Sequence, residues 1–242
     1  MRKIVVFGAS SDLSRALLAE LDRRGCYAKF FVQSKSGWDS HRDFIGSLKG
    51  QVELFQSDLT LPDAAATITA EIAAVCPAPD AIAFFQAPKF HYERFSKLDW
   101  SDFQTEIDLQ LKLPIVALNT FLPAMAKRRS GKVLFALSSV TEGRPPAALS
   151  HYVTAKYAVL GLMRSLSQEY AAKNIQINGV SPSMVETKFL SDLDEKFLQL
   201  AAEAHPLKRN ARVDDIVSAM SLLLTEGSDY MSGVNLPITG GG

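Results

Sequence analysis

The feature that most limits the fold of this chain is a repeated alternation of short apolar runs with longer amphipathic segments. Apolar runs this continuous in Val, Ile, Leu and Phe are typical of parallel strands buried on both faces. Strands followed by helices imply right-handed crossovers and a doubly wound α/β sheet of about seven strands, with helices on both faces. We predict strands over residues 3–7, 28–32, 52–55, 81–85, 132–137, 175–180 and 234–238, and helices over residues 13–24, 62–75, 101–127, 151–173, 191–204 and 213–225.

Composition and charge argue for one globular domain over residues 1–242. The 26 basic residues balance the 26 acidic ones, which argues against a nucleic-acid-binding surface. Cys26 and Cys76 form no CxxC pair, and the four histidines lack metal-ligand spacing. We therefore expect no metal site and a reducing, cytoplasmic compartment. No apolar run approaches the roughly 18–20 residues that span a bilayer, so no membrane is expected.

The turn after the first strand is a candidate pyrophosphate site. It reads Gly8-Ala9-Ser10-Ser11-Asp12-Leu13-Ser14-Arg15 and runs into a helix, whose N–H groups and dipole would face an anion. Of the three glycines typical of a dinucleotide-binding turn, Gly8 alone is present. Two interpretations of Asp12 stay open: its carboxylate caps the helix, or it lies near the phosphate with Arg15 offsetting its charge. The predicted cofactor contacts in this turn are Gly8, Ser10, Ser11, Asp12 and Leu13.

The end of the second strand bears on cofactor choice. It reads Gln33-Ser34-Lys35, without the carboxylate that would hold the ribose hydroxyls of NAD. We predict that Lys35 meets a 2′-phosphate and that Ser34 donates a hydrogen bond, so NADP(H) is favoured and NAD(H) stays possible. The alternative is that Lys35 is a solvated loop residue.

The third feature is a tyrosine–lysine pair downstream of a strand that ends in serines. Tyr152 and Lys156 are four residues apart on a predicted helix, which places them on one face. Ser139 follows the predicted strand 132–137 and therefore lies at the same sheet edge. A structural interpretation also exists, in which Tyr152 is a half-buried tyrosine and Lys156 a surface lysine.

The segments Ser138-Ser139-Val140 and Tyr152-Val153-Thr154-Ala155-Lys156, with their spacing, resemble the active-site stretch of short-chain dehydrogenases/reductases. Asn178-Gly179-Val180-Ser181-Pro182 and the Gly-rich C-terminus resemble later parts of the same family, so the resemblance covers nearly the whole chain. It implies a Rossmann-like fold and hydride transfer with a nicotinamide cofactor.

The resemblance also implies roles for individual residues. Tyr152 would be the general acid or base, and Lys156 would lower the pKa of Tyr152 and bind the nicotinamide ribose. Ser139 would hydrogen-bond the substrate oxygen, and Gln110 stands where the family usually has a relay Asn. Ser138 is expected to be structural. Further cofactor contacts by resemblance are Asp58, Leu59, Gln86, Ala87, Pro182, Val185 and Thr187.

Substrate and assembly follow less directly. Two segments that follow predicted strands favour a small, apolar substrate, although core or interface roles are an alternative. Their residues are Phe90, His91, Tyr92 and Phe95 after the fourth strand, and Met184, Phe189 and Leu190 after the sixth. The resemblance implies a homodimer or homotetramer. Two other functions stay open because glycines are missing from the turn: a cofactor-poor binding or scaffold subunit, and non-redox acid–base chemistry at the same residues.

Overall fold

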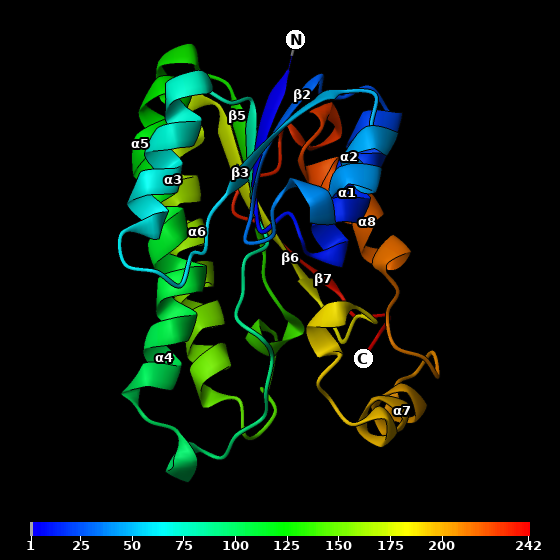
Figure 1. Ribbon diagram of the computed structural model, residues 1–242. Helices are drawn as coiled ribbons and strands as arrows, with labels where there is room; N and C mark the ends of the chain where they lie inside the picture. Colours follow the sequence, from blue (N-terminus) through cyan, green and yellow to red (C-terminus); the bar gives the residue numbers. More distant parts are fainter. Residues whose placement is uncertain (1) are drawn as a thin grey trace.

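The structure, a computed structural model, describes residues 2–242 and contains one parallel sheet with helices on both faces (Figure 1). The strand order is β3-β2-β1-β4-β5-β6-β7, and every neighbouring pair is parallel. The predicted doubly wound, Rossmann-like sheet is therefore confirmed. The strands are β1 (Lys3–Phe7), β2 (Lys29–Ser34), β3 (Gln51–Gln56), β4 (Ala81–Phe84), β5 (Gly131–Ala136), β6 (Ile175–Pro182) and β7 (Asn235–Ile238).

The helices divide between the two faces of the sheet (Figure 1). One face is covered by α3 (Ala64–Val75), α4 (Trp100–Ile107), α5 (Leu113–Arg128) and α6 (Ser150–Tyr170), and the other by α1 (Asp12–Arg23), α2 (Arg42–Ser47) and α8 (Val213–Leu223). The remaining α-helix, α7 (Glu195–Ala204), lies beyond the carboxyl ends of the strands. The chain reverses strand order between β1 and β4, and such a switch point opens a crevice for a ligand.

Each face has its own apolar core. Toward α3, α5 and α6, the rings of Phe7, Phe84 and Phe135 on adjacent strands stack at centroid distances of 5.4 and 5.2 Å. On the other face, α1 buries Leu17 and Leu21, whose spacing places both on the side turned to the sheet. These two cores hold the strand ends in fixed positions.

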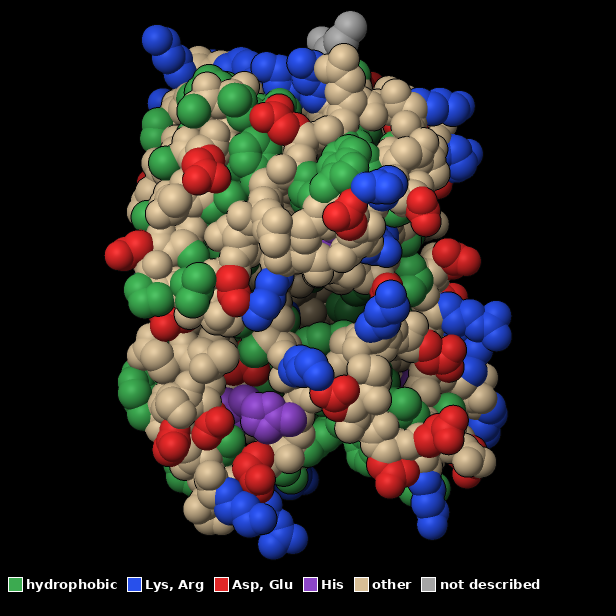
Figure 2. All heavy atoms as spheres, viewed as in Figure 1, with side chains coloured by type: hydrophobic (Ala, Val, Ile, Leu, Met, Phe, Trp, Pro, Cys, Tyr) green, Lys and Arg blue, Asp and Glu red, His purple; other side chains and the backbone are tan. Residues whose placement is uncertain are grey.

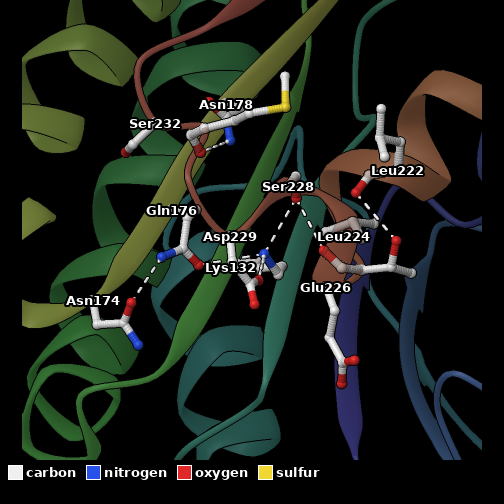
Figure 3. A network of polar contacts seen from close by, with 12 residues as sticks. Lys132, Asn174, Gln176, Asn178, Leu222, Leu224, Glu226, Ser228, Asp229 and Ser232 are labelled. Carbon is white, nitrogen blue, oxygen red and sulfur yellow. Dashed lines mark hydrogen bonds and ion pairs between the residues drawn. The ribbon is translucent and has the colours of Figure 1, made fainter.

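A buried lysine stabilises the opposite, amino end of the sheet (Figure 3). Lys132 Nζ, on β5, donates to Asp229 Oδ1 at 2.7 Å and to Ser228 Oγ at 3.2 Å. Ser228 Oγ in turn donates to the Thr225 carbonyl oxygen at 3.0 Å. The bonds from Lys132 thus tie the segment after α8 to the sheet. Because its charge is paired and hydrogen-bonded, Lys132 is a structural residue.

The helices differ from the sequence prediction in two places. The short helix α2 was not predicted, since its six residues carry no extended periodic pattern. The predicted helix over residues 101–127 is interrupted by a π-helical turn, Asp108–Lys112, between α4 and α5.

Taken together, α4, the π-helical turn and α5 form one helical run, Trp100–Arg128, which is long and apolar enough to cross a bilayer, contrary to the sequence expectation. Half of its most apolar window is buried in the protein, so the run is weak evidence for a membrane span.

Candidate active site

A cleft of about 820 Å³ lies at the carboxyl ends of the strands. Figure 2 shows the surface hollowed between the α4 side and the α7 side, with Lys and Arg side chains beside the opening. Most of the predicted site residues line this one cavity: Gly8, Ser10, Ser11, Asp12, Leu13, Lys35, Asp58, Leu59, Gln86, Ala87, Ser139, Tyr152, Lys156, Pro182, Val185 and Thr187. Ser34 and Gln110 lie outside its lining.

Tyr152 and Lys156 lie together on α6, and each side chain is only 6% exposed. Lys156 Nζ donates to the Ala136 carbonyl oxygen at 2.7 Å and lies 5.5 Å from the centre of the Tyr152 ring. Ser138 hydrogen-bonds Tyr152, and its Oγ also accepts from Val140 N–H at 3.4 Å. Ser138 and Ser139 both line the cleft with Tyr152, and it is Ser138 that acts on the phenol.

The charge states of the pair follow from burial. Loss of solvent raises the pKa of Tyr152 above its ordinary value, and this outweighs the opposing hydrogen bond from Ser138. The lowering of this pKa by Lys156 that the resemblance implied is not found. The ammonium is directed at Ala136 O and lies over the ring, not at the phenol oxygen. Burial also lowers the pKa of Lys156 to about 8.

A buried carboxylate that the sequence interpretation overlooked lies behind this pair. Glu106, on α4, is 3% exposed and accepts a hydrogen bond from Gln110 Nε2 in the π-helical turn. Burial raises the pKa of Glu106 to about 7, against the effects of Gln110 and Lys156. Gln110 is therefore engaged with Glu106 and turned away from the cleft lining.

The turn after β1 keeps the anion-binding geometry with one glycine. Gly8 has φ +80°, and a Cβ added there would lie 2.6 Å from Gln86 N, so the close approach to the end of β4 requires glycine. Ser11 is the N-cap of α1 and makes no side-chain capping bond. The first N–H groups of α1 are thus uncapped by side chains at the cleft, as an anion site requires.

The capping role considered for Asp12 is wrong. Asp12 is the first residue of α1, and its carboxylate accepts from Lys188 N–H at 2.8 Å, which joins the turn to the segment after β6. Arg15 does not offset its charge either. Its guanidinium lies against His41 Nδ1 at 3.1 Å and over the Phe44 ring at 5.5 Å. The negative charge that Asp12 brings to the cleft is therefore not balanced by Arg15.

Ser14 takes the place of another glycine of the usual turn. Its side chain is fully buried, and its Oγ lies 3.0 Å from Gly8 O and 2.8 Å from Ser11 O. The hydroxyl satisfies backbone carbonyls that face each other across the turn. A small side chain that points inward can thus stand where glycine is usual.

The end of β2 places three neighbouring side chains in different surroundings. Ser34 is buried and its Oγ lies 2.9 Å from His41 Nε2, so the predicted hydrogen bond from Ser34 to a 2′-phosphate is not supported. Lys35 is exposed and its Nζ lies 2.8 Å from Asp58 Oδ2. The hydrogen bond from Lys35 lowers the pKa of Asp58 to about 2, so the carboxylate stays charged. Lys35 and Asp58 thus form one ion pair at the cleft edge.

Gln33, which was also overlooked, holds the turn in place. Its Oε1 accepts from Gly8 N–H at 3.0 Å and its Nε2 donates to Ser57 O at 2.8 Å. Side chains alternate along a strand, so Gln33 and Lys35 share a face that Ser34 does not. That alternation was the signal in the sequence that would have separated them.

Aromatic side chains gather at the Tyr152 end of the cleft. The Phe90 ring packs edge-on against Tyr152 at 5.1 Å and against Tyr92 at 5.3 Å. Phe189, after β6, lies 5.3 Å from Phe90 between ring centroids, and Phe197 on α7 lies 5.1 Å from Tyr92. Side chains from three separate segments thus form an apolar wall, and Phe90 joins it to the Tyr152 ring.

Comparisons with known proteins agree with this geometry. Residues 8–242 match the family model described as enoyl-(acyl carrier protein) reductase. An uncharacterized oxidoreductase of Bacillus subtilis, YmfI, is 29% identical over 98% of this chain and 97% of its own length. An acetoacetyl-CoA reductase of Synechocystis is 24% identical over 98% of this chain and 94% of its own. A solved structure described as ElxO with NADP bound superposes with a TM-score of 0.87, at 19% identity over 99% of this chain and 98% of that one.

Proposed function

The chain belongs to the short-chain dehydrogenase/reductase family and is an oxidoreductase of that kind, and on this premise we propose that it transfers a hydride between NADP(H) and a carbonyl or secondary alcohol of a small apolar substrate. The observation that carries the proposal is that one cleft joins the Gly8 turn to the buried Tyr152–Lys156 pair. The N-terminus of α1 fits a pyrophosphate, and the pair fits proton transfer at the far end.

The residues of this chain divide the chemistry between them. The bound cofactor supplies or accepts the hydride. Tyr152 gives its phenol proton to the carbonyl oxygen in reduction and takes a proton in oxidation. The phenol is protonated at neutral pH, as the acid role requires, and burial makes it a weaker acid than a solvated tyrosine. Lys156, which lines the cleft next to Tyr152, would hold the nicotinamide ribose, and the hydroxyls of Ser138 and Ser139 orient the reacting oxygen.

Lys35 supports NADP(H) over NAD(H). It stands at the end of β2, which itself carries no carboxylate for the ribose hydroxyls, and its pairing with Asp58 from the next strand end holds the ammonium at the cleft edge. The structure described as ElxO with NADP bound is a precedent for this cofactor on the fold. The aromatic wall of Phe90, Tyr92 and Phe189 supports an apolar substrate.

The deciding experiment is a titration of the purified protein with NADPH, NADH and their oxidised forms, followed by a screen of apolar ketones and aldehydes. We expect NADPH to bind more tightly than NADH and to be consumed in step with carbonyl loss. Absence of binding at millimolar NADPH would favour the scaffold alternative. Substrate conversion without cofactor consumption would favour non-redox acid–base chemistry.

We also propose assembly into a homodimer or homotetramer through α5 and α6. Ile115 and Tyr157 are large apolar side chains on these helices that remain exposed in the single chain. Light scattering coupled to gel filtration should give a mass of two or four chains, and a monomer at micromolar concentration would contradict the proposal.

A further inference from the structure

We propose that Glu106 is a positioning residue that keeps Lys156 in its charged form and so extends turnover to alkaline pH. The inference rests on the proposed function, because it assigns Lys156 its part in that reaction. It concerns a group one layer behind the cleft, on a helix that supplies none of the predicted catalytic tyrosine, lysine or serine residues.

The need for such a residue follows from the surroundings of Lys156. An ammonium group has three N–H donors, and Lys156 Nζ makes one hydrogen bond, to Ala136 O. The side chain is almost fully buried. A buried charge without a partner is costly, and a lysine in such a place tends to lose its proton. A nearby anion would oppose that loss.

Glu106 is placed to be that anion. α4 packs against α6, and Glu106 lies on the buried side of α4, one helical turn before Gln110. The hydrogen bond from Gln110 Nε2 fixes the carboxylate in position. The negative charge of Glu106 favours the charged form of Lys156, and the positive charge of Lys156 favours the ionised form of Glu106. The two buried groups therefore titrate as a coupled pair.

The other titratable groups around the pair come from three elements. α6 itself carries Tyr152 and His151, and the segment after β4 supplies His91 and Tyr92. Asp102, on α4, acts on His151. The His91 and His151 rings lie 4.6 Å apart between centroids, and His91 favours the ionised form of Glu106. Among residues 2–242, Glu106 is the one charged group that acts on Lys156.

The sign of the effect gives the pH range. Glu106 carries its charge above a pKa of about 7, whereas Lys156 holds its proton below a pKa of about 8. Below pH 7 Lys156 holds its proton while Glu106 becomes neutral and loses its influence. Above that pH the ionised Glu106 delays the loss of the proton from Lys156, so the influence of Glu106 falls on the alkaline limb of the pH profile.

The test compares Glu106→Gln, which keeps the shape and removes the charge, with Glu106→Asp, which keeps the charge. The turnover number for NADPH-dependent carbonyl reduction is measured from pH 6 to 9.5. We expect the alkaline limb of Glu106→Gln to move down by about one pH unit, a tenfold change in the acid constant, with that of Glu106→Asp close to the wild-type limb. An alkaline limb of Glu106→Gln that coincides with the wild-type limb would overturn the inference.

A second readout separates this inference from the proposed function. The ¹³C chemical shift of the Lys156 ε-carbon, assigned by its loss in Lys156→Arg, is followed against pH in lysine-labelled protein without substrate. A lower midpoint in Glu106→Gln than in the wild type would support the pairing even if no carbonyl were reduced. Equal midpoints would overturn it even if NADPH-dependent turnover were normal. Thermal unfolding of both variants checks that they are folded.

Discussion

The two ends of the cleft differ in how many of the residues typical of the family they retain. At the β5–α6 end, Ser139, Tyr152 and Lys156 are all present with the expected spacing and lie in one cavity. At the β1–α1 end, one glycine of three remains, and the chain holds the turn with side chains instead: Ser14 inside it and Gln33 beneath it. A turn tolerates replacement of a glycine where space exists for an inward-pointing side chain. It does not tolerate replacement at Gly8, where the backbone of β4 approaches too closely.

Tyr152→Phe tests the β5–α6 end and should have the largest effect. Removing the phenol hydroxyl takes away the proton donor, so the turnover number should fall by about 10²–10⁴-fold while NADPH affinity stays near the wild-type value. Tyr230→Phe, which alters a fully exposed tyrosine away from the cleft lining, is the control and should leave turnover unchanged. A Tyr152→Phe enzyme with most of its rate would contradict the assignment of this end as catalytic.

Gly8→Ala tests whether the altered turn still depends on its remaining glycine. The added Cβ would meet Gln86 N, and a positive φ is strained for alanine, so we expect a loss of roughly 1–3 kcal/mol in unfolding free energy and more than tenfold weaker NADPH binding. Gly25→Ala is a matched control, because Gly25 also has positive φ but no atom lies within 4 Å of the added Cβ. Chemical denaturation and cofactor titration measure both effects. Equal losses in the two variants would mean that strain, and not the close approach, is responsible.

Lys35→Ala sharpens the comparison at the far edge of the cleft. The ratio of NADPH to NADH affinity should fall by about tenfold, roughly 1.4 kcal/mol, because one charge pair with the 2′-phosphate is lost. Lys89→Ala is the control: Lys89 is another exposed cleft lysine, paired with Asp192 at 2.9 Å. A preference for NADPH that survives Lys35→Ala would assign selection of the 2′-phosphate to another residue.

Asp12→Asn should produce the smallest and most informative change. The amide oxygen can still accept from Lys188 N–H, but the negative charge near the pyrophosphate is gone. We expect NADPH to bind about fivefold more tightly at low salt, roughly 1 kcal/mol, with a smaller difference at high salt. Asp39→Asn, at an exposed position, should change nothing. Weaker binding in Asp12→Asn would show that the charged hydrogen bond to Lys188 matters more than repulsion.

The parallel sheet was predictable because each strand is a continuous apolar run, and burial on both faces leaves that mark in the sequence. The tyrosine and lysine were found for a similar reason, since a four-residue spacing on one helix is local. Glu106 was not found, because nothing in the residues around it shows that α4 turns its polar side chain toward α6. The inward turn of Ser34 depends on His41, which belongs to a helix of six residues too short to predict. What escaped prediction was set by contacts between segments distant in the chain.

The π-helical turn Asp108–Lys112 determines how α4, which lines one side of the cleft, is rotated about its axis. A π turn accommodates one residue more than an α-helical turn, so it sets the rotation of α4 relative to α5. Deleting one residue there and closing the helix would rotate α4 by about 100° and shift it by about 1.5 Å. Thr105 and Leu109 would then leave the cleft lining, and Glu106 would turn off the side that faces α6. The position of the α4 side of the cleft is therefore sensitive to insertions and deletions of single residues in this turn. It is far less sensitive to exchanges of one apolar side chain for another.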